Sequence, residues 1–461
     1  MFGFTTIATI YNINRISTII GEIYQIQDIN NKHYLEGRLI ELKERILESG
    51  CIGIKFTQWF ITKIKTYGDE LNNIIIKYFE DIFDNCPQHS LEYSENIFLE
   101  EFKIPLENII EIDSLKIIGS GSIGQVYKGI LKGLNKQVAI KVKHPDVMKT
   151  IDNIEPLINI ITYLQSYNYF RNKYNLYIDF EEFLDDLKMQ VDFRNEVFNS
   201  ITFGKNYQDN NNIIIPKVYY YTSNIIIFEY VGGVSYSTLE DYAKSQVSLN
   251  LISFFEESLL VHNFIHCDLH EKNWAVLYKD GVYKLIIYDY GICYRANSVE
   301  FSRELWDCFE NNNSKKLIEI AKNNIIIDDF SQEMSDEIEI AINHILETNV
   351  NSHYILSKII NIFSKRGNVK FNKIAINLII YFSMIEKILK ENNIISNSNF
   401  SIKNPEKLIY NLKMNILSYG KAYNVYHKLG KYIENTLNGI PKNYTLFNDT
   451  ENSDLTFISL D

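Results

Sequence analysis

The stretch from Ile118 to Lys141 reads IGSGSIGQVYKGILKGLNKQVAIK, and it decides how the rest of the sequence is interpreted. Its first half has the pattern G-x-G-x-x-G-x-V, which is formed by Gly119, Gly121, Gly124 and Val126. Its second half ends in V-A-I-K, a short β-type run one strand and one turn further on. A glycine-rich turn alone is a weak signal, but a strand that ends in lysine at this distance is typical of a kinase-type nucleotide site.

We expect this stretch to bind ATP. Glycines allow positive φ angles, and a turn built from them offers backbone N–H groups to phosphates. Val126 is expected to cover the adenine ring and Lys141 to reach the α- and β-phosphates. The residues expected to contact the nucleotide from this stretch are Ile118, Gly119, Ser120, Gly121, Ser122, Gly124, Val126, Ala139 and Lys141.

A second segment is expected to contact the base. After a β-type run ending at Phe228, the chain reads E-Y-V-G-G over residues 229–233, which is typical of a hinge between two lobes. The backbone groups of Glu229 and Val231 are the expected partners of adenine.

Acidic residues downstream complete the pattern. Residues 266–273 read HCDLHEKN, with Asp268 and Asn273 five apart, as in the kinase catalytic loop H-R-D-x-x-x-x-N. Asp289-Tyr290-Gly291 then has the position and shape of the metal-binding D-F-G motif. We expect Asp268 to accept a proton and Asn273 and Asp289 to bind Mg²⁺.

A kinase fold also needs a helical carboxylate to hold the strand lysine. Between Lys141 and the next strands, the strongest helical pattern covers residues 180–198, with one apolar stripe formed by Phe180, Leu184, Leu187, Val191 and Phe198. Glu196 lies on another face of this predicted helix. We expect Glu196 to pair with Lys141, although a solvated acidic face is the simpler interpretation of that pattern alone.

Composition limits the class of protein and its partners. A hydrophobic content of 46% in 461 residues supplies a core for two or three domain-sized units. The net charge of −12 argues against nucleic acid as a partner. No run reaches the about 18 apolar residues of a membrane span, so at most peripheral membrane contact is expected.

Cysteine usage indicates the compartment. The five cysteines form no C-x-x-C pair and are odd in number, which predicts reduced thiols in a cytosolic-type compartment. Residues 1–21 contain Arg15 and no acidic residue, a weak transit-peptide signal that leaves organelle targeting open.

The motifs together resemble those of the UbiB/ADCK family of atypical protein-kinase-like proteins, over about residues 54–295. The family's K-x-G-Q motif resembles Lys55-Phe56-Thr57-Gln58, and S-I-G-Q-V at 122–126 is identical. The V-A-I-K-V-K-H-P run at 138–145 and the H-x-D-x-H-x-x-N loop at 266–273 are similar as well. The E-x-D-x-x-x-E helix resembles residues 190–196, with Gln190 in place of the first glutamate. Thr57 replaces the K-x-G-Q glycine, and Gly119-Ser120-Gly121 replaces the family's alanines.

The resemblance implies a fold and a function. It implies an α+β, two-lobed kinase-like fold with a small β-rich N-lobe, a helical C-lobe and a helical N-terminal extension. The expected divisions are 1–33 (N-terminal segment), 34–112 (extension with the K-x-G-Q-like motif), 113–231 (N-lobe), 232–436 (C-lobe) and 437–461 (polar, acidic tail). The extension is expected to place Lys55 and Gln58, which share a helix face, over the nucleotide cleft as regulatory residues.

The expected activity is that of an ATP- and Mg²⁺-dependent phosphotransferase or ATPase with an unknown acceptor. The resemblance implies a link to quinone or other lipid metabolism. Two alternatives stay open from the residues themselves: a nucleotide-binding regulatory scaffold without turnover, and a small-molecule kinase of the aminoglycoside or choline type.

Overall fold

The structure is a computed structural model. It describes residues 32–48, 53–58, 88–111, 115–145, 180–270, 272–295, 313–324 and 332–347, together with isolated positions elsewhere. The predicted tail (437–461) and nearly all of the predicted segment 1–33 lie outside the described residues, as do Cys51 and Cys86. The three described cysteines, Cys267, Cys293 and Cys308, are free thiols.

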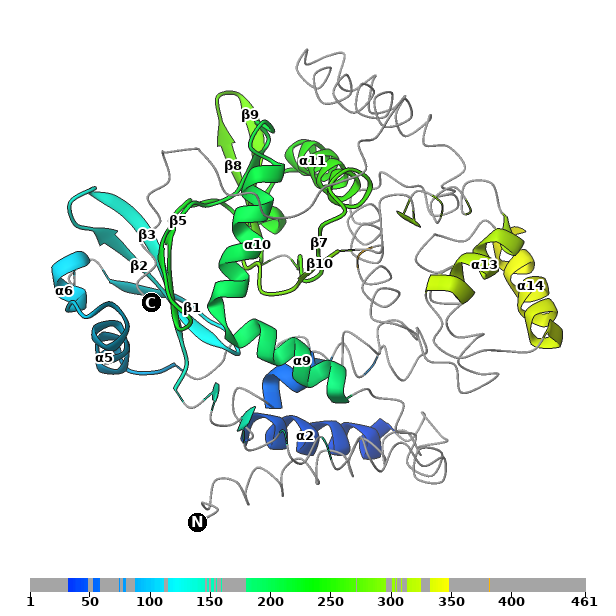
Figure 1. The fold of residues 1–461 in the computed structure, drawn as a ribbon, viewed down its shortest axis with the longest axis horizontal. Coiled ribbons are helices and arrows are strands. Elements are labelled where there is room, and N and C mark those ends of the chain that lie inside the picture. Colours follow the sequence, from blue (N-terminus) through cyan, green and yellow to red (C-terminus); the bar gives the residue numbers. More distant parts are fainter. Residues whose placement is uncertain are drawn as a thin grey trace.

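A five-stranded antiparallel sheet carries the stretch quoted above (Figure 1). Its strands, in spatial order, are β1 (Lys116–Ser120), β2 (Gly124–Leu131), β3 (Lys136–Lys143), β6 (Ile225–Glu229) and β5 (Val218–Tyr221). Alternate residues of a strand point to opposite faces. Val138, Ile140 and Val142 of β3 are therefore buried on one face, while Ala139 and Lys141 belong to the other.

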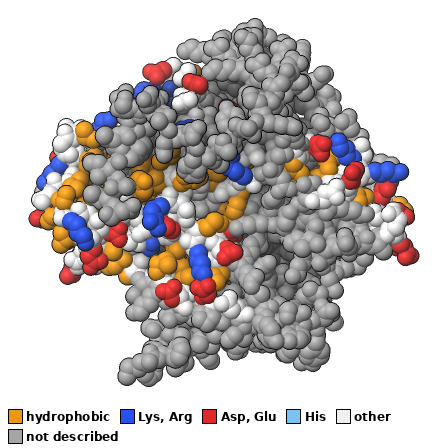
Figure 2. All heavy atoms as spheres, viewed as in Figure 1, with side chains coloured by type: hydrophobic (Ala, Val, Ile, Leu, Met, Phe, Trp, Pro, Cys, Tyr) orange, Lys and Arg blue, Asp and Glu red, His pale blue; other side chains and the backbone are white. Residues whose placement is uncertain are grey.

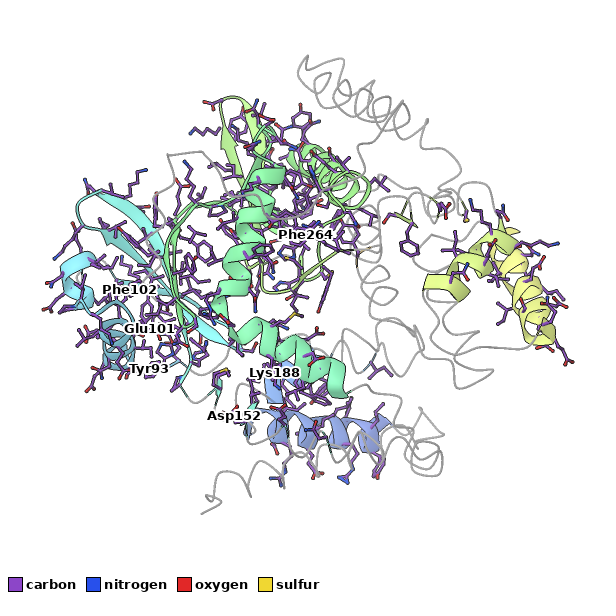
Figure 3. The ribbon with its side chains drawn as sticks, in the orientation of Figure 1. Tyr93, Glu101, Phe102, Asp152, Lys188 and Phe264 are labelled. Carbon is purple, nitrogen blue, oxygen red and sulfur yellow. The ribbon has the colours of Figure 1, made fainter. Side chains whose placement is uncertain are left out.

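Helix α5 (Leu91–Phe102), followed by the short α6 (Leu106–Ile109), covers the first face. The side chain of Ser90 caps α5 by accepting a hydrogen bond from the Tyr93 amide, which satisfies one of its free N–H groups. Phe98 and Phe102 of α5 pack with the buried residues of β2, β3 and β6. In Figure 3, Tyr93, Glu101 and Phe102 mark this helix beside the sheet.

Helices α9 (Phe180–Val191) and α10 (Phe193–Asn206) supply the core on the second face. The prediction of one continuous helical stripe to Phe198 is wrong, because the helix breaks at Asp192. The Asp192 side chain accepts from the Arg194 amide and starts α10 as an N-cap. Phe198 is consequently 53% exposed, whereas Phe193 at the start of α10 is buried.

The remaining described elements include a smaller three-stranded sheet and several helices. The sheet has the order β4 (Ile213–Ile214), β9 (Val282–Ile287), β8 (Trp274–Lys279), and β7 (Ile265–His266) pairs with β10 (Cys293–Tyr294). Helices α2 (Lys32–Glu48), α11 (Asp241–Leu260), α13 (Ser314–Asn324) and α14 (Gln332–Glu347) and the 3₁₀ turn η3 (Tyr236–Thr238) complete the set. Asp280 and Gly281 have positive φ angles of 56° and 78° and form the tight turn between β8 and β9.

The described surface mixes charge and apolar side chains. Figure 2 shows basic and acidic side chains interspersed among hydrophobic ones on the visible face. Among the described residues, no helix is both long and apolar enough to cross a membrane.

The three glycines of the loop (residues 119–126, the glycine loop) have different structural roles. The expectation of positive φ is wrong for them, since only Gly133 and Gly281 have positive φ among the described glycines. Gly119 lies in extended strand β1 opposite Val126, and a Cβ there would meet nothing within 4 Å. A Cβ on Gly124 would lie 2.8 Å from the Val142 carbonyl oxygen and 3.1 Å from Cζ of Phe193.

We predict that Gly124→Ala lowers the free energy of unfolding by about 1–3 kcal/mol, because the added methyl group overpacks a backbone contact. Gly119→Ala is the matched control and should change it by no more than about 0.5 kcal/mol. Urea unfolding of the two variants and the wild type measures both values. Equal stability of the two variants would contradict the close approach at Gly124.

Candidate active site

The side chain of Lys141 joins three separate segments of the chain. Its Nζ donates to both carboxylate oxygens of Glu196 on α10, at 2.8 and 2.7 Å. It also lies 3.3 Å from Oδ1 of Asp289, which follows β9. The pairing predicted between Lys141 and Glu196 is therefore present, and Asp289 shares the same ammonium group.

Burial and charge act in opposite directions on these groups. Burial alone would lower the pKa of Lys141, but the carboxylates of Asp289 and Glu196 raise that pKa well above its ordinary value. Burial would raise the pKa of Asp289, but the cations Lys141 and Lys55 hold it well below the usual range. Burial raises the pKa of Glu196 to about 7 in spite of Lys141, because this carboxylate is only 3% exposed. The ammonium thus stays charged, and Asp289 is its ionised partner on the open side.

The helical turn at residues 53–58 brings the K-x-G-Q-like motif to the same place. The charge of Lys55 lowers the pKa values of both Asp289 and Glu196, so it acts on the acidic side chains that hold Lys141. Gln58 accepts a hydrogen bond at 3.2 Å from the Ser122 hydroxyl of the glycine loop. Thr57, which stands where the family has glycine, donates its hydroxyl proton within its own turn, to the Gly53 carbonyl at 2.9 Å.

Hydrogen bonds between side chains and backbone groups fix the segment around Asp268. Nδ2 of Asn273 donates to the Asp268 carbonyl at 2.8 Å, and the Asp268 amide donates to Nδ1 of His266 at 3.3 Å. Nε2 of His266 in turn donates to the Tyr288 carbonyl at 3.1 Å, and burial lowers the pKa of this histidine. The Asp268 carboxylate is left 39% exposed. A fixed loop that presents an open carboxylate suits a proton acceptor.

Asp289 has an unusual backbone conformation. Its φ angle is 51°, in the left-handed region, and the Gly291 amide donates to its carboxylate at 3.3 Å. The next residue, Tyr290, accepts at its carbonyl from Nδ2 of Asn199 on α10, at 2.9 Å. Helix α10 therefore supports both Lys141 and the segment that carries Asp289.

The predicted metal ligands offer the right donor atoms for Mg²⁺. Asn273 uses its Nδ2 on the Asp268 carbonyl, which leaves Oδ1 as its atom for a cation. Asp289 contributes a carboxylate that is 46% exposed. Mg²⁺ takes hard oxygen ligands and usually combines one or two protein groups with phosphates and water. Among the described residues there is no cluster of three or more His, Cys, Asp or Glu side chains able to hold a metal ion.

The other predicted nucleotide contacts lie on the three strands β1, β2 and β3, in the turn between β1 and β2, and in the segment at 229–233. Val126 is the cross-strand partner of Lys141, and Ala139 is on the same face of β3. Ile118, Gly119 and Ser120 end β1, with Ile118 exposed, whereas Ser122 and Gly124 are buried. Glu229 ends β6, where its amide donates to the Lys217 carbonyl at 2.7 Å.

Tyr288 is a site residue that the sequence analysis missed. Its hydroxyl donates to the Val231 carbonyl at 2.6 Å, so it reaches from the end of β9 to the segment expected to bind adenine. Burial and the neighbouring Tyr230 raise its pKa to about 12, which keeps the phenol protonated. No sequence motif marks this residue, because its contact with Val231 joins positions that are 57 residues apart.

Comparison with known proteins identifies the family. A family model described as the ABC1 atypical kinase-like domain matches residues 81–322. The chain belongs to this family. The family expected from the motifs is therefore confirmed, and with it a kinase-like fold of mixed helices and sheets.

Individual relatives of the ABC1 family cover parts of the chain. The Arabidopsis thaliana protein ACTIVITY OF BC1 COMPLEX KINASE 8, chloroplastic, is 28% identical over 261 residues, which are 54% of this chain and 33% of that protein. The probable serine/threonine-protein kinase abkC of Dictyostelium discoideum is 25% identical over 293 residues, 59% of this chain and 41% of that protein. The chain thus spans less than half the length of these two curated relatives.

A solved structure is similar to part of the chain. The Rv3197–erythromycin complex from Mycobacterium tuberculosis covers 69% of this chain and 85% of that one, with 14% identity and a TM-score of 0.46.

We predict that Lys141→Met lowers the free energy of unfolding by about 3 kcal/mol, because it leaves buried Glu196 without its cation. The double variant Lys141→Met/Glu196→Gln should regain about 1–2 kcal/mol of that loss, since a neutral amide replaces the unpaired carboxyl group. Urea unfolding of the wild type, both single variants and the double variant gives the coupling energy. Additive effects of the two substitutions would mean that the pair is not formed in solution.

Proposed function

We propose that this protein is an ATP- and Mg²⁺-dependent atypical kinase or ATPase, which transfers or hydrolyses the γ-phosphate. The observation that carries the proposal is the position of Lys141 between Glu196 and Asp289. Ion pairing of this kind orients a lysine toward phosphates and sets the metal-binding carboxylate beside it. The matching family of atypical kinase-like proteins supports the same activity.

Each residue has a specific part in the proposed reaction. Lys141 grips the α- and β-phosphates, and the glycine loop covers them. The carboxylate of Asp268 accepts the proton from an acceptor hydroxyl or from water. Asn273 Oδ1 and Asp289 would hold the metal, and Mg²⁺ supplies neutralisation of the phosphate charge when bound. Ala139, Val126 and the backbone of Glu229 and Val231 would surround the base.

The proposed function includes a two-lobed, kinase-like arrangement of the chain. The five-stranded sheet with α5, α9 and α10 would form the N-lobe (113–231), and α11 with the smaller sheet would begin the C-lobe (232–436). The extension (34–112) would place Lys55 and Gln58 over the nucleotide, as their effects on Asp289 and Ser122 indicate.

The acceptor and the compartment also belong to the proposal. We infer a lipid or quinone-related acceptor from the family resemblance. Chloroplastic names among the relatives support organelle targeting for some family members. A scaffold without turnover is the alternative that the following experiment separates from an enzyme.

We predict different effects for the two catalytic carboxylates. Asp268→Asn should lower turnover by about 10²–10⁴-fold and largely spare MgATP binding, because it removes only the proton acceptor. Asp289→Asn should weaken MgATP binding itself, because it removes a metal ligand. Titration calorimetry with MgATP and a phosphate-release assay give both quantities. Wild-type turnover in Asp268→Asn would remove Asp268 from the role of proton acceptor, whereas a wild type that binds MgATP without turnover would favour the scaffold.

The role of the N-terminal helical turn can be tested with one residue. Lys55→Ala should alter turnover, because it removes a positive charge that acts on Asp289 and Glu196. Lys55→Arg keeps that charge and should retain most of the wild-type rate. Steady-state kinetics and thermal melts of these variants distinguish an effect of the Lys55 charge on turnover from a purely structural role of the helical turn. If Lys55→Ala lowers the melting temperature but leaves kcat and KM unchanged, the turn has no regulatory role.

A further inference from the structure

A continuous chain of hydrogen bonds joins helix α5 to the glycine loop on the side of the sheet opposite Lys141. Gln125 of β2 donates to the Tyr127 hydroxyl at 2.5 Å, and that hydroxyl lies 2.8 Å from the hydroxyl of Ser94. Ser94 lies 2.9 Å from Nε2 of His89, and Nδ1 of His89 lies 2.8 Å from Nδ1 of His144. Nε2 of His144 lies 3.0 Å from the Gly121 carbonyl in the loop.

The protons of this chain can be placed at every link when both imidazole rings are neutral. The Gly121 carbonyl can only accept, so Nε2 of His144 carries a proton. In a neutral imidazole the other nitrogen is then an acceptor, so the close contact with His89 requires a proton on Nδ1 of His89. Nε2 of His89 must therefore accept from Ser94, and the Ser94 oxygen accepts from Tyr127. The chain has one direction, from Gln125 to Gly121.

Burial favours the neutral form of both histidines, and the direction of the chain depends on that form. A second proton on His144 would face the proton of His89 directly. Burial lowers the pKa values of both rings, that of His89 to about 4, and each charge would further repel the other. Among the described residues, the phenol rings of Tyr93 and Tyr127 lie beside His89, and Tyr93 packs edge-on at 4.9 Å.

The chain ends on the atoms that shape the loop. The His144 amide donates to the Ile123 carbonyl at 2.9 Å, while its ring bonds Gly121, whose own amide donates to Gly124 at 2.9 Å. His144 thus holds the turn at 121–124 by its ring and its backbone. At the other end, Gln125 exchanges two hydrogen bonds with the backbone of His89, which fixes the approach to α5.

We propose that His144 is a positioning residue for the glycine loop and that His89 on the α5 side orients it through their Nδ1–Nδ1 hydrogen bond. This inference rests on the proposed function, since the loop is taken to cover the phosphates of ATP. Simple packing is insufficient as an account of the pair, because an apolar side chain at position 144 would remove the hydrogen bond that the ring donates to the Gly121 carbonyl.

Two substitutions of His144 separate the loop contact from the contact with α5. The amide nitrogen of glutamine can replace Nε2 of the ring, so His144→Gln retains the donor to Gly121. Asparagine is shorter and reaches only the position of Nδ1, so His144→Asn retains only the link to His89. We expect KM for MgATP to rise about tenfold in His144→Asn and no more than about threefold in His144→Gln, with kcat changed less than KM in both.

A second variant and a control variant distinguish a specific effect on KM from a general loss of folding. Ser94→Ala leaves His144 intact and removes the proton donor to His89, and it should raise KM for MgATP by about threefold. His262→Leu changes a half-buried histidine that bonds Glu257 instead, and it should leave KM unchanged. Thermal melts of all variants identify any loss of folding.

A spectroscopic signature tests the proton direction independently of activity. Long-range ¹H–¹⁵N correlation spectra at pH 7 should show His89 protonated at Nδ1 and His144 at Nε2, both neutral. A cationic His144, or a proton on its Nδ1, would overturn the inference, and so would unchanged KM in both His144→Asn and Ser94→Ala. If the wild type binds no MgATP, the proposed function fails and takes this inference with it; normal wild-type binding with unaffected variants removes this inference alone.

Discussion

The ammonium group of Lys141 is shared by two carboxylates that come from distant parts of the chain, and the arrangement of the site depends on it. A buried charge is costly unless it is paired and hydrogen-bonded. Glu196 meets this requirement from α10, and Asp289 meets it from the segment after β9. Strand β3, helix α10 and the segment that carries Asp289 can therefore take this arrangement only together.

The two faces of the five-stranded sheet have different surroundings. The face toward α5 is a packed core with a polar chain at its edge, whereas the other face holds the charged residues and the start of α10. Gly124 lies in close contact with both strand β3 and helix α10. Because it has no side chain, β2 can approach both β3 and Phe193 at this position. The loop is thus shaped by packing and hydrogen bonds from the protein rather than by unusual backbone angles at its glycines.

Local patterns predicted much of this arrangement. The alternation of β3, the tight turn at Asp280-Gly281 and the motif spacing are local properties, and they predicted the strands, the hairpin and the ion pair between Lys141 and Glu196. The break at Asp192 was missed because a side chain that caps a helix competes with the apolar periodicity that continues it. Tyr288 and His89 were missed for another reason: their partners are 57 and 55 residues away. The Lys141–Glu196 pair spans a similar distance but belongs to a known kinase pattern, whereas these two contacts do not.

The hydrogen bond from Asn199 to the Tyr290 carbonyl has a mechanical consequence. Glu196 and Asn199 are three residues apart on one rigid helix, so a displacement of α10 would release Lys141 and the segment after β9 in the same movement. A ligand or partner that moves α10 would therefore change both halves of the proposed nucleotide site at the same time.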